Sequence, residues 1–437
     1  MKHRFFILAF VAFISTTNAQ EKIELEQVVT LALEKNYDVL LSKNTSSVNA
    51  TNNNYAGAAF LPQLNATTSD IWNNTQQSLE YKDITKNNSG TNESNTVNAS
   101  TQLIWTLFDG TKMFATRERI SIVAEQGELL VKDQMVNSIA SIITNYYNVV
   151  RQKQQLKATQ EQMAVSEVRV TLAEKKLQVG TGGKPELLQA RVDYNAQRTL
   201  VLQQEAAIVQ LKEQLNVLSG MQLPPQFEVS DSIEINLTLQ REDFFENISN
   251  SNYSLQAARR NFSITNLQLQ ERRAELFPII NFSGAYNYSR ANNTKLVNAY
   301  GNTFSLSNGF NYGFSATIPI LNGLITRRQI ELAKITIDRQ QVLYNQLEAN
   351  VNVGLRNAFT NYDNARKVLT IEEETILLAK ENVFIALESF KRGVTTFIEL
   401  RTAQQSLADA YNRLITARYN AKVAETELLR LNGGLLK

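Results

Sequence analysis

Residues 179–190 read VGTGGKPELLQA, and residues 392–403 read RGVTTFIELRTA. The two stretches share a glycine at the second position, Glu-Leu at the eighth and ninth, and an alanine at the twelfth, and the second lies 213 positions after the first. Two further pairs that end in glycine keep this offset: Phe108-Asp109-Gly110 with Leu321-Asn322-Gly323, and Leu218-Ser219-Gly220 with Leu431-Asn432-Gly433. An insertion in either copy would break the constant offset, so the spacing indicates one structural unit that occurs twice.

The offset becomes 216 further upstream, where Pro62-Gln63-Leu64-Asn65 aligns with Pro278-Ile279-Ile280-Asn281. Three additional residues therefore lie between these landmarks in the second copy, in a loop. We divide the chain into a first repeat at 20–220, a linker at 221–239 and a second repeat at 240–437.

Each repeat has the pattern of a helix, two strands, a very long helix, a turn and a shorter helix. The first repeat places these elements at 24–57, 60–72, 97–108, 111–179 and 185–218. The second places them at 240–276, 277–289, 310–320, 324–392 and 397–431. None of the six prolines falls inside a proposed helix, as the missing N–H requires.

The two long helices are 69 residues each by this assignment, which corresponds to about 100 Å. The two shorter helices of the first repeat are 34 residues each, so end to end they match the long one. We therefore expect every long helix to be flanked by two stacked half-length helices, all antiparallel. Apolar residues recur at helical spacing and predict a packing seam: Ile139, Ile142, Ile143, Tyr146, Val149 and Val150.

The first nineteen residues have the pattern of a secretory signal peptide. Lys2 and Arg4 are basic, Phe5 to Ile14 form a short apolar run, and Thr17-Asn18-Ala19 resembles a cleavage site, so we expect the mature chain to begin at Gln20. An apolar run of ten residues is too short to span a bilayer, which takes about 20. No comparable run follows, so we expect no membrane-spanning helix.

The composition argues against an enzyme. The chain has no cysteine, and its one histidine, His3, lies in the signal peptide. The mature chain thus lacks the side chains of most nucleophile and base pairs and of nearly all zinc sites, and we expect no cofactor and no metal. Loss of Lys2 and Arg4 leaves 42 basic and 42 acidic residues, and this balance does not favour nucleic acid as a partner.

The strand segments alternate between apolar and uncharged polar residues over 10 to 13 positions. This length and this pattern are typical of transmembrane β-strands, although one sheet of a soluble sandwich alternates in the same way. The stretches 73–96 and 290–309 are rich in Asn, Ser and Thr and predict long outward loops. We expect these aromatic residues at the membrane interface: Trp72, Trp105, Phe282, Tyr286, Tyr288, Phe310, Tyr312 and Phe314.

Four strands cannot close a barrel, and an open sheet edge in lipid leaves backbone groups without partners at several kcal/mol each. The membrane interpretation therefore predicts an oligomer. With helices attached at the inner end of every strand, the barrel continues into a helical tube.

With these features in place, the whole mature chain resembles the TolC-like outer-membrane efflux channels. The residues that carry the resemblance are the repeated turn with its following helix and the strand-to-helix corners Phe108-Asp109-Gly110 and Leu321-Asn322-Gly323. The resemblance implies a mostly α fold with a small transmembrane β part, in a homotrimer whose twelve-stranded β-barrel continues into an α-helical barrel through the periplasm. It also places the linker at the equatorial region of that barrel.

The same resemblance implies a passive conduit for efflux or secretion in the outer membrane. Its partners would be outer-membrane lipid, a periplasmic adaptor (membrane fusion protein) and an inner-membrane pump, which together open the channel. The substrate stays open between drug, metal and a polypeptide of type I secretion. A second interpretation is a structural or adhesive coiled-coil envelope protein without a pore, and an envelope hydrolase is a third and weaker one.

The resemblance implies that the turns between long and shorter helices form the periplasmic tip, where the adaptor docks. By position these residues are Val179, Gly180, Thr181, Arg392, Gly393 and Val394. An alternative reading is that Gly180 and Gly393 only end a helix in left-handed geometry.

Some TolC-like channels line their entrance with a carboxylate after the second turn, a position that Glu399 occupies here, with Glu186 as its counterpart in the first repeat. Glu399 also completes a capping box with Thr396, which is the alternative role for its carboxylate. A second acidic residue and a latch arginine of such channels are replaced by Thr402 and Thr395. A closed-state latch of that kind is therefore not expected at these positions.

Overall fold

The computed structural model describes residues 21–224, 226–246, 248–298, 300–392 and 394–436. The predicted signal peptide and Gly393 lie outside these ranges. The chain forms two compact units. Unit 1 contains the described residues up to 42 together with 131–253 and those from 350 on, and unit 2 contains 43–130 and 254–349.

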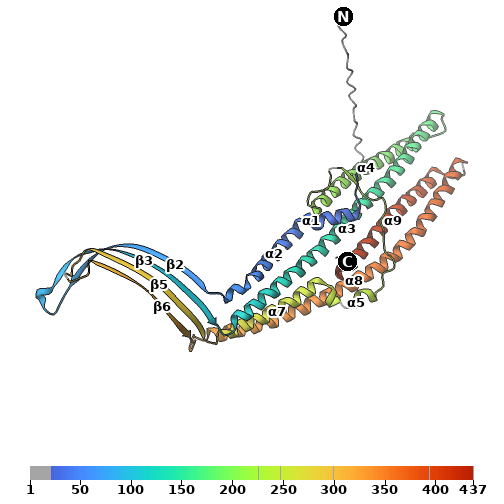
Figure 1. Cartoon of the computed structure of the whole chain (residues 1–437). Helices are drawn as coiled ribbons and strands as arrows, with labels where there is room; N and C mark the ends of the chain where they lie inside the picture. Colours follow the sequence, from blue (N-terminus) through green and yellow to red (C-terminus); the bar gives the residue numbers. More distant parts are fainter. Residues whose placement is uncertain (1–20, 225, 247, 299, 393, 437) are drawn as a thin grey trace, which may run out of the picture. The chain divides into compact units, whose positions relative to one another are not determined.

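Unit 2 contains a four-stranded sheet (Figure 1). Its strands are β2 (Gln63–Leu79), β3 (Asn88–Phe108), β5 (Ile279–Lys295) and β6 (Phe304–Thr317), in the order β2-β3-β5-β6. All three pairings are antiparallel, so β3 of the first repeat pairs directly with β5 of the second. Within the described residues, β2 and β6 are therefore the two edges of the sheet.

The strands are longer than the sequence predicted, and the predicted outward loops at 73–96 and 290–309 are wrong. β2 continues to Leu79 and β3 begins at Asn88, so only residues 80–87 connect them, and residues 296–303 connect β5 to β6. Polar side chains hydrogen-bond across the extended part, such as Thr91 Oγ1 to Gln76 Oε1 at 3.2 Å. The predicted strand at 310–320 instead ends at Thr317, two residues before Pro319, which has no N–H to donate.

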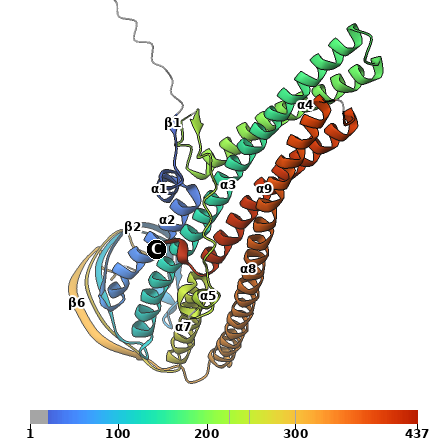
Figure 2. The same cartoon turned by 90° about the vertical axis from the view of Figure 1, so that its right-hand side faces the viewer.

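The long helices match the prediction within two residues at each end. They are α3 (Lys112–Gln178) and α8 (Ile325–Lys391), of 67 residues each. The helices that follow them are α4 (Lys184–Leu218) and α9 (Phe397–Leu431), of 35 residues each. Figures 1 and 2 show α4 beside α3 and α9 beside α8, so each repeat contributes one helical hairpin to unit 1.

The two helices predicted at 24–57 and 240–276 are interrupted. The first divides into α1 (Leu25–Lys35) and α2 (Tyr37–Asn54), and the second into α5 (Glu242–Phe245), α6 (Ile248–Ser251) and α7 (Tyr253–Ala274). Buried asparagines cause the repeated break. The Asn36 side chain accepts from the N–H groups of Asp38 and Val39, which begins a new helix, and donates to Leu218 O at 2.8 Å.

Asn252 repeats this arrangement in the second repeat. Its Nδ2 donates to Leu431 O at 2.9 Å, so the last carbonyls of α4 and α9 are each bound by an asparagine of the repeat's first helical segment. Gly220 and Gly433, which follow these helices, lie too close to neighbouring backbone to carry a side chain. Cβ atoms on Gly220 and Gly433 would lie 2.3 Å from Lys35 O and 2.6 Å from Ser251 O, and both glycines have positive φ.

The core of unit 1 confirms the predicted packing seam. All six apolar residues of the seam are buried in one cluster with Val28, Leu215 and Phe227. The Tyr146 hydroxyl donates to Ile23 O and accepts from Ser230 N, both at 2.9 Å. This tyrosine thus holds the parallel pair β1 (Glu21–Lys22) and β4 (Phe227–Glu228) against α3.

The linker between the repeats, which Tyr146 of α3 already contacts, is also hydrogen-bonded to α8 and α9. The Tyr362 hydroxyl donates to Asn236 O at 2.7 Å, and Glu425 Oε2 of α9 accepts from Asn236 N at 3.0 Å. The linker is therefore bound to both long helices. No helix in the described part of the chain is sufficiently long and apolar to cross a membrane.

Candidate channel surfaces

The sheet of unit 2 has one aromatic face. Side chains of alternate rows of the sheet point to opposite faces. Strand pairing places all eight predicted interface aromatics on this face, because the row of each lies an even number of residues from the row of Trp105. The Phe282 and Phe314 ring centroids lie 5.2 Å apart, and the Phe310 and Tyr312 rings stack with centroids 6.3 Å apart. Trp105 also donates its indole N–H to Phe60 O at 2.9 Å, which satisfies its polar group.

The two tryptophans mark the ends of the aromatic face. Trp105 pairs with Phe282, and Trp72 pairs with Asn95, which lies ten residues before Trp105 on β3. Ten residues of antiparallel strand span about 34 Å. Phe304, on β6, lies in the row of Trp72, so both ends of the face carry aromatic rings.

The opposite face of the sheet consists of uncharged residues. From the row of Gln63 to the row of Asn73, every described residue on this face is Asn, Gln, Ser, Thr, Ala, Gly or Ile. The polar side chains bind one another across strands: Ser100 Oγ donates to Asn287 Oδ1 at 2.9 Å, and Asn287 Nδ2 donates to Asn311 Oδ1 at 2.8 Å. Asn and Ser therefore satisfy their polar groups in ladders.

The two hairpin turns have the same backbone closure. Thr181 N donates to Lys176 O and Val394 N donates to Ser389 O, both at 2.9 Å and both across five residues. Gly180 has a φ of 77°, which is the left-handed cap that the alternative reading expects. The side chains of Val179 and Val394 are 72% and 77% exposed, so each described turn presents an apolar residue to solvent.

The carboxylate of Glu399 is used by its own helix. Its Oε2 accepts from Thr396 N at 2.9 Å, and Thr396 Oγ1 accepts from Glu399 N at 3.3 Å, which completes a capping box. Thr402 donates its hydroxyl to Ile398 O at 2.9 Å. Glu186 lies in the first turn of α4, half-buried. A lining role for these three residues stays a prediction.

The structure reveals a charge cluster near the turns that sequence reasoning missed. The Asp193 carboxylate on α4 accepts from Arg169 Nη2 of α3 at 3.0 Å, Arg401 Nη2 of α9 at 3.0 Å and Gln189 Nε2 at 2.9 Å. It therefore joins the hairpin of one repeat to the hairpin of the other. A cavity of about 400 Å³ lies beside it, between the two hairpins.

Two cation–π contacts reinforce this junction. The Arg169 guanidinium lies 4.7 Å from the Phe397 ring centroid, and the Lys176 ammonium lies 4.7 Å from that of Phe390. Only the helical spacing of Gln189 and Asp193, four residues apart, was visible in the sequence. The partners on α3 and α9 depend on how the hairpins pack.

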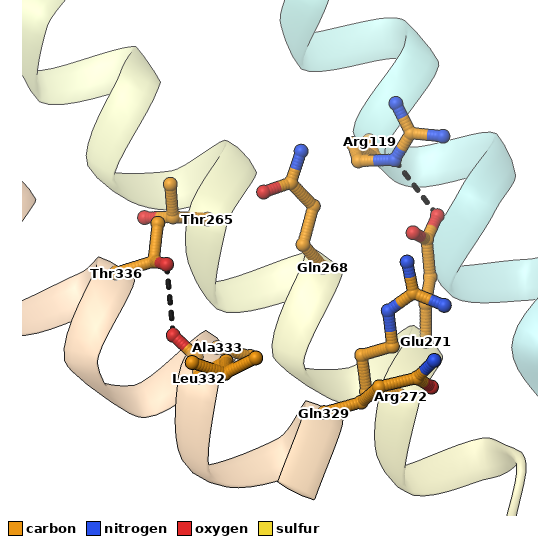
Figure 3. A pocket seen from close by; sticks show the side chains of 9 residues that line it. All are labelled: Arg119, Thr265, Gln268, Glu271, Arg272, Gln329, Leu332, Ala333 and Thr336. Atoms are coloured by element: carbon orange, nitrogen blue, oxygen red, sulfur yellow. Dashed lines mark hydrogen bonds and ion pairs between the residues drawn. The ribbon is translucent and has the colours of Figure 1, made fainter. Parts of the chain in front are cut away.

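In unit 2, ion pairs join α3 to α7. Arg119 Nε lies 2.7 Å from Glu271 Oε1, Lys112 Nζ lies 2.9 Å from Glu275 Oε1, and Arg260 lies 3.3 Å from Glu125. Figure 3 shows the Arg119–Glu271 pair at one side of a cavity of about 480 Å³, with residues of α8 opposite. The same Glu271 oxygen also accepts a hydrogen bond from Thr116 Oγ1 of α3 at 2.8 Å.

Two carboxyl groups of the linker, Glu228 and Asp231, have lowered pKa values. Burial opposes ionisation of Glu228, yet hydrogen bonds from Lys153 and Lys212 outweigh it and lower the pKa of this carboxyl. The N–O distances are 2.8 Å to Lys153 and 3.1 Å to Lys212. Within the described residues, no cluster of His, Asp and Glu could hold a metal ion.

Comparison with known proteins agrees with this architecture. Residues 28–221 and 245–434 match the family described as outer membrane efflux protein. Outer membrane efflux protein BepC of Brucella suis is 24% identical over 347 residues, which are 76% of this chain and 71% of the relative. Nodulation protein T of Rhizobium leguminosarum is 25% identical over 154 residues, 35% of this chain and 32% of the relative.

Solved structures share the fold. The CmeC outer membrane channel of Campylobacter jejuni superposes with a TM-score of 0.78 at 17% identity, over 94% of this chain and 85% of that one. The MtrE outer membrane channel of Neisseria gonorrhoeae superposes with a TM-score of 0.73 at 16% identity, over 94% of this chain and 89% of that one. The chain therefore belongs to the outer membrane efflux protein family, and it is an outer-membrane channel for efflux that extends into the periplasm.

Proposed function

We propose that three copies of this chain form one passive export channel. The observation that carries the proposal is the pair of unpaired edges, β2 and β6, on a sheet with one aromatic and one polar face. If β6 of each copy pairs with β2 of the next, three four-stranded sheets close a barrel of twelve strands. Closure removes the edge N–H and C=O groups from lipid, where each would lack a partner at several kcal/mol.

The spacing of the tryptophans supports this placement in a membrane. The about 34 Å between the Trp105 and Trp72 rows becomes about 26 Å when strands tilt by about 40°, as in outer-membrane barrels. The apolar band of such barrels is about 25 Å tall, between two girdles of aromatic residues. Trp105 with Phe282 forms the inner girdle and Trp72 with Phe304 the outer one.

The uncharged face then lines the lumen. Several of its Ser and Asn side chains are bonded to one another, and none of its residues between the rows of Gln63 and Asn73 is charged, so solutes of either charge meet a neutral polar wall. Such a wall suits a conduit in which the strands themselves select little by charge. The channel catalyses no reaction in this proposal, and it needs no cofactor.

The turns of the two hairpins form the docking tip for a periplasmic adaptor, which couples the channel to an inner-membrane pump. Val179, Gly180 and Thr181 present one docking surface, and Arg392, Gly393 and Val394 the other. The exposure of Val179 and Val394 supports this role, because an apolar side chain at a hairpin tip gains free energy when a partner covers it.

The proposal is tested on protein purified from outer membranes in detergent. We expect a particle of three protomers by light scattering and discrete single-channel currents after reconstitution into a planar bilayer. A coiled-coil envelope fibre would give no current. A monomer, or a stable oligomer without conductance, would overturn the proposed assembly.

A further inference from the structure

The aromatic face of the sheet carries two charges between its tryptophan rows. Among the described strand residues on this face they are Asp70 of β2 and Arg290 of β5, and both lie in one row: Asp70 pairs with Val97, which pairs with Arg290, which pairs with Leu306. Charged side chains are strongly disfavoured on the lipid side of a barrel unless they reach the interface or a partner.

The two charges differ in their partners. The Asp70 carboxylate accepts a hydrogen bond from Asn95 Nδ2. Arg290 is exposed and forms no hydrogen bond or ion pair with any described residue. Nearby Lys295 differs from Arg290 because it pairs with Glu93. Asp70 and Arg290 are two strands apart, about 9.6 Å between backbones, with Val97 between them.

The position of Arg290 matches the headgroup level of the membrane. Its row lies two residues from the row of Trp72, a vertical step of about 5 Å for strands tilted by about 40°. The side chain of arginine is long enough to cover this step, with its stem along the apolar surface and its guanidinium at the girdle. The helices begin at the opposite ends of the strands, so this end faces away from the periplasm.

We propose that Arg290 binds the phosphate of an outer-leaflet lipid, a phosphorylated glycolipid of the lipid A type. The planar guanidinium can donate two parallel hydrogen bonds to phosphate oxygens. Leu306 and Phe304 on the neighbouring strand offer an apolar surface to the acyl chains of the same lipid. The trimer of this channel thereby carries three lipid sites, one on each protomer. This inference rests on the proposed placement of the sheet in the membrane.

The test measures lipid retention on purified, conducting trimer by native mass spectrometry, with added lipid A in its bisphosphorylated and dephosphorylated forms. We expect Arg290→Gln to weaken retention of the bisphosphorylated form about fivefold, which corresponds to about 1 kcal/mol for one arginine near an anionic surface. Arg290→Lys should keep part of the affinity. Lys295→Gln is the matched control and should leave retention unchanged.

The remaining outcomes separate this site from its competitors. Wild type should bind dephosphorylated lipid A as weakly as Arg290→Gln does. Equal retention of the phosphorylated lipid by wild type and Arg290→Gln would sink the proposal. Arg290→Gln should also weaken lipid retention when it is made in an Asp70→Asn background. If it has no effect there, Arg290 acts as the partner of Asp70, in its own or a neighbouring protomer, and not as a lipid ligand. A wild-type trimer that retains the phosphorylated lipid but conducts no current would refute the proposed channel and not the lipid site.

Discussion

Asn36 and Asn252 each connect two helices that lie far apart in the sequence. Each is buried, interrupts a helix, and binds the last carbonyl of the shorter helix of its own repeat. The sequence analysis predicted one continuous helix over each of these segments, at 24–57 and 240–276. At Asn36 the break is favoured by the cap on the N–H groups of Asp38 and Val39 together with the tertiary contact to Leu218.

We expect Asn36→Ala to destabilise unit 1 by about 1–3 kcal/mol, because the Leu218 carbonyl and the N–H groups of Asp38 and Val39 lose their partner. Thermal unfolding and hydrogen exchange at residues 36–40 measure the effect. Asn52→Ala, at an exposed position of α2, is the control and should be neutral or slightly stabilising. An equal response of the two variants would contradict the capping role.

The lowered pKa of Glu228 leads us to expect that acid destabilises the linker. The pKa of this carboxyl lies below the ordinary 4.5 because its bonds to Lys153 and Lys212 outweigh the effect of burial. A lowered carboxyl pKa stabilises the fold above the unfolded value, and this contribution disappears as the pH falls through the folded value. We expect hydrogen-exchange protection of residues 227–239 to be constant above about pH 5 and to fall towards pH 3.

The control for this pH dependence is Glu228→Gln. It should protect the linker less at neutral pH and should lose most of the change between pH 5 and 3, with a remainder from Asp231, whose pKa Lys153 also lowers. A variant with the full wild-type pH dependence would show that another group is responsible.

At the scale of elements, the two long helices and the helices that follow them were predictable, whereas the first helix of each repeat and the strands were predictable only in part. A helix of 67 residues repeats its apolar stripe many times, so its limits are recognised within two residues. Strand recognition requires contrast between two faces. From Asn73 to Gln76 both faces of β2 are polar, so the alternation vanishes although the strand continues to Leu79.

The docking tip is testable at its glycines. Gly180→Val and Gly393→Val together should abolish pump-dependent export while trimer stays in the outer membrane, because a β-branched residue is strained at the φ of 77° found at Gly180 and changes the turn that the partner meets. Export assays with membrane quantification measure this. Gly57→Ala, with open space around it, is the control. Unchanged export by the double variant would count against docking at these turns.

The Asp193 cluster predicts a mechanical junction between hairpins. Asp193→Ala leaves Arg169 and Arg401 without their shared carboxylate, so we expect faster hydrogen exchange in α4 and α9 near the turns, with a loss of about 1–3 kcal/mol for this half-buried group. Asp409→Ala is the control, since its hydrogen-bond donor Gln405 lies on the same helix. No difference between these variants would show that packing alone holds the hairpins together.

At the scale of the whole molecule, the neutral lumen leads to a measurable selectivity. Ser100 lies in the centre of the uncharged face, bonded to Asn287. Ser100→Asp adds one negative charge per protomer to the proposed barrel, so the reversal potential in a salt gradient should shift towards cation selectivity. Ser100→Asn changes the size of the side chain without charge and should leave the reversal potential in place. Identical potentials would place Ser100 outside the conducting path.

The internal duplication decided how much could be predicted. The constant offset of 213 indicated the repeat and, through it, the hairpins and strand pairs. The contacts of Asp193 and the exposed state of Arg290 depend on how the repeats pack and pair. No sequence spacing encodes those contacts.

The duplication also bears on stoichiometry. In the proposed trimer, two hairpins from each protomer would give the tip a sixfold pseudo-symmetry, because the two turns share one backbone hydrogen bond across five residues. The side chains do not follow this symmetry, since Val179 in one turn corresponds to Arg392 in the other. A partner that contacts only the backbone of the turns can bind at six turns of the trimer, whereas a partner that requires Arg392 can bind at only three.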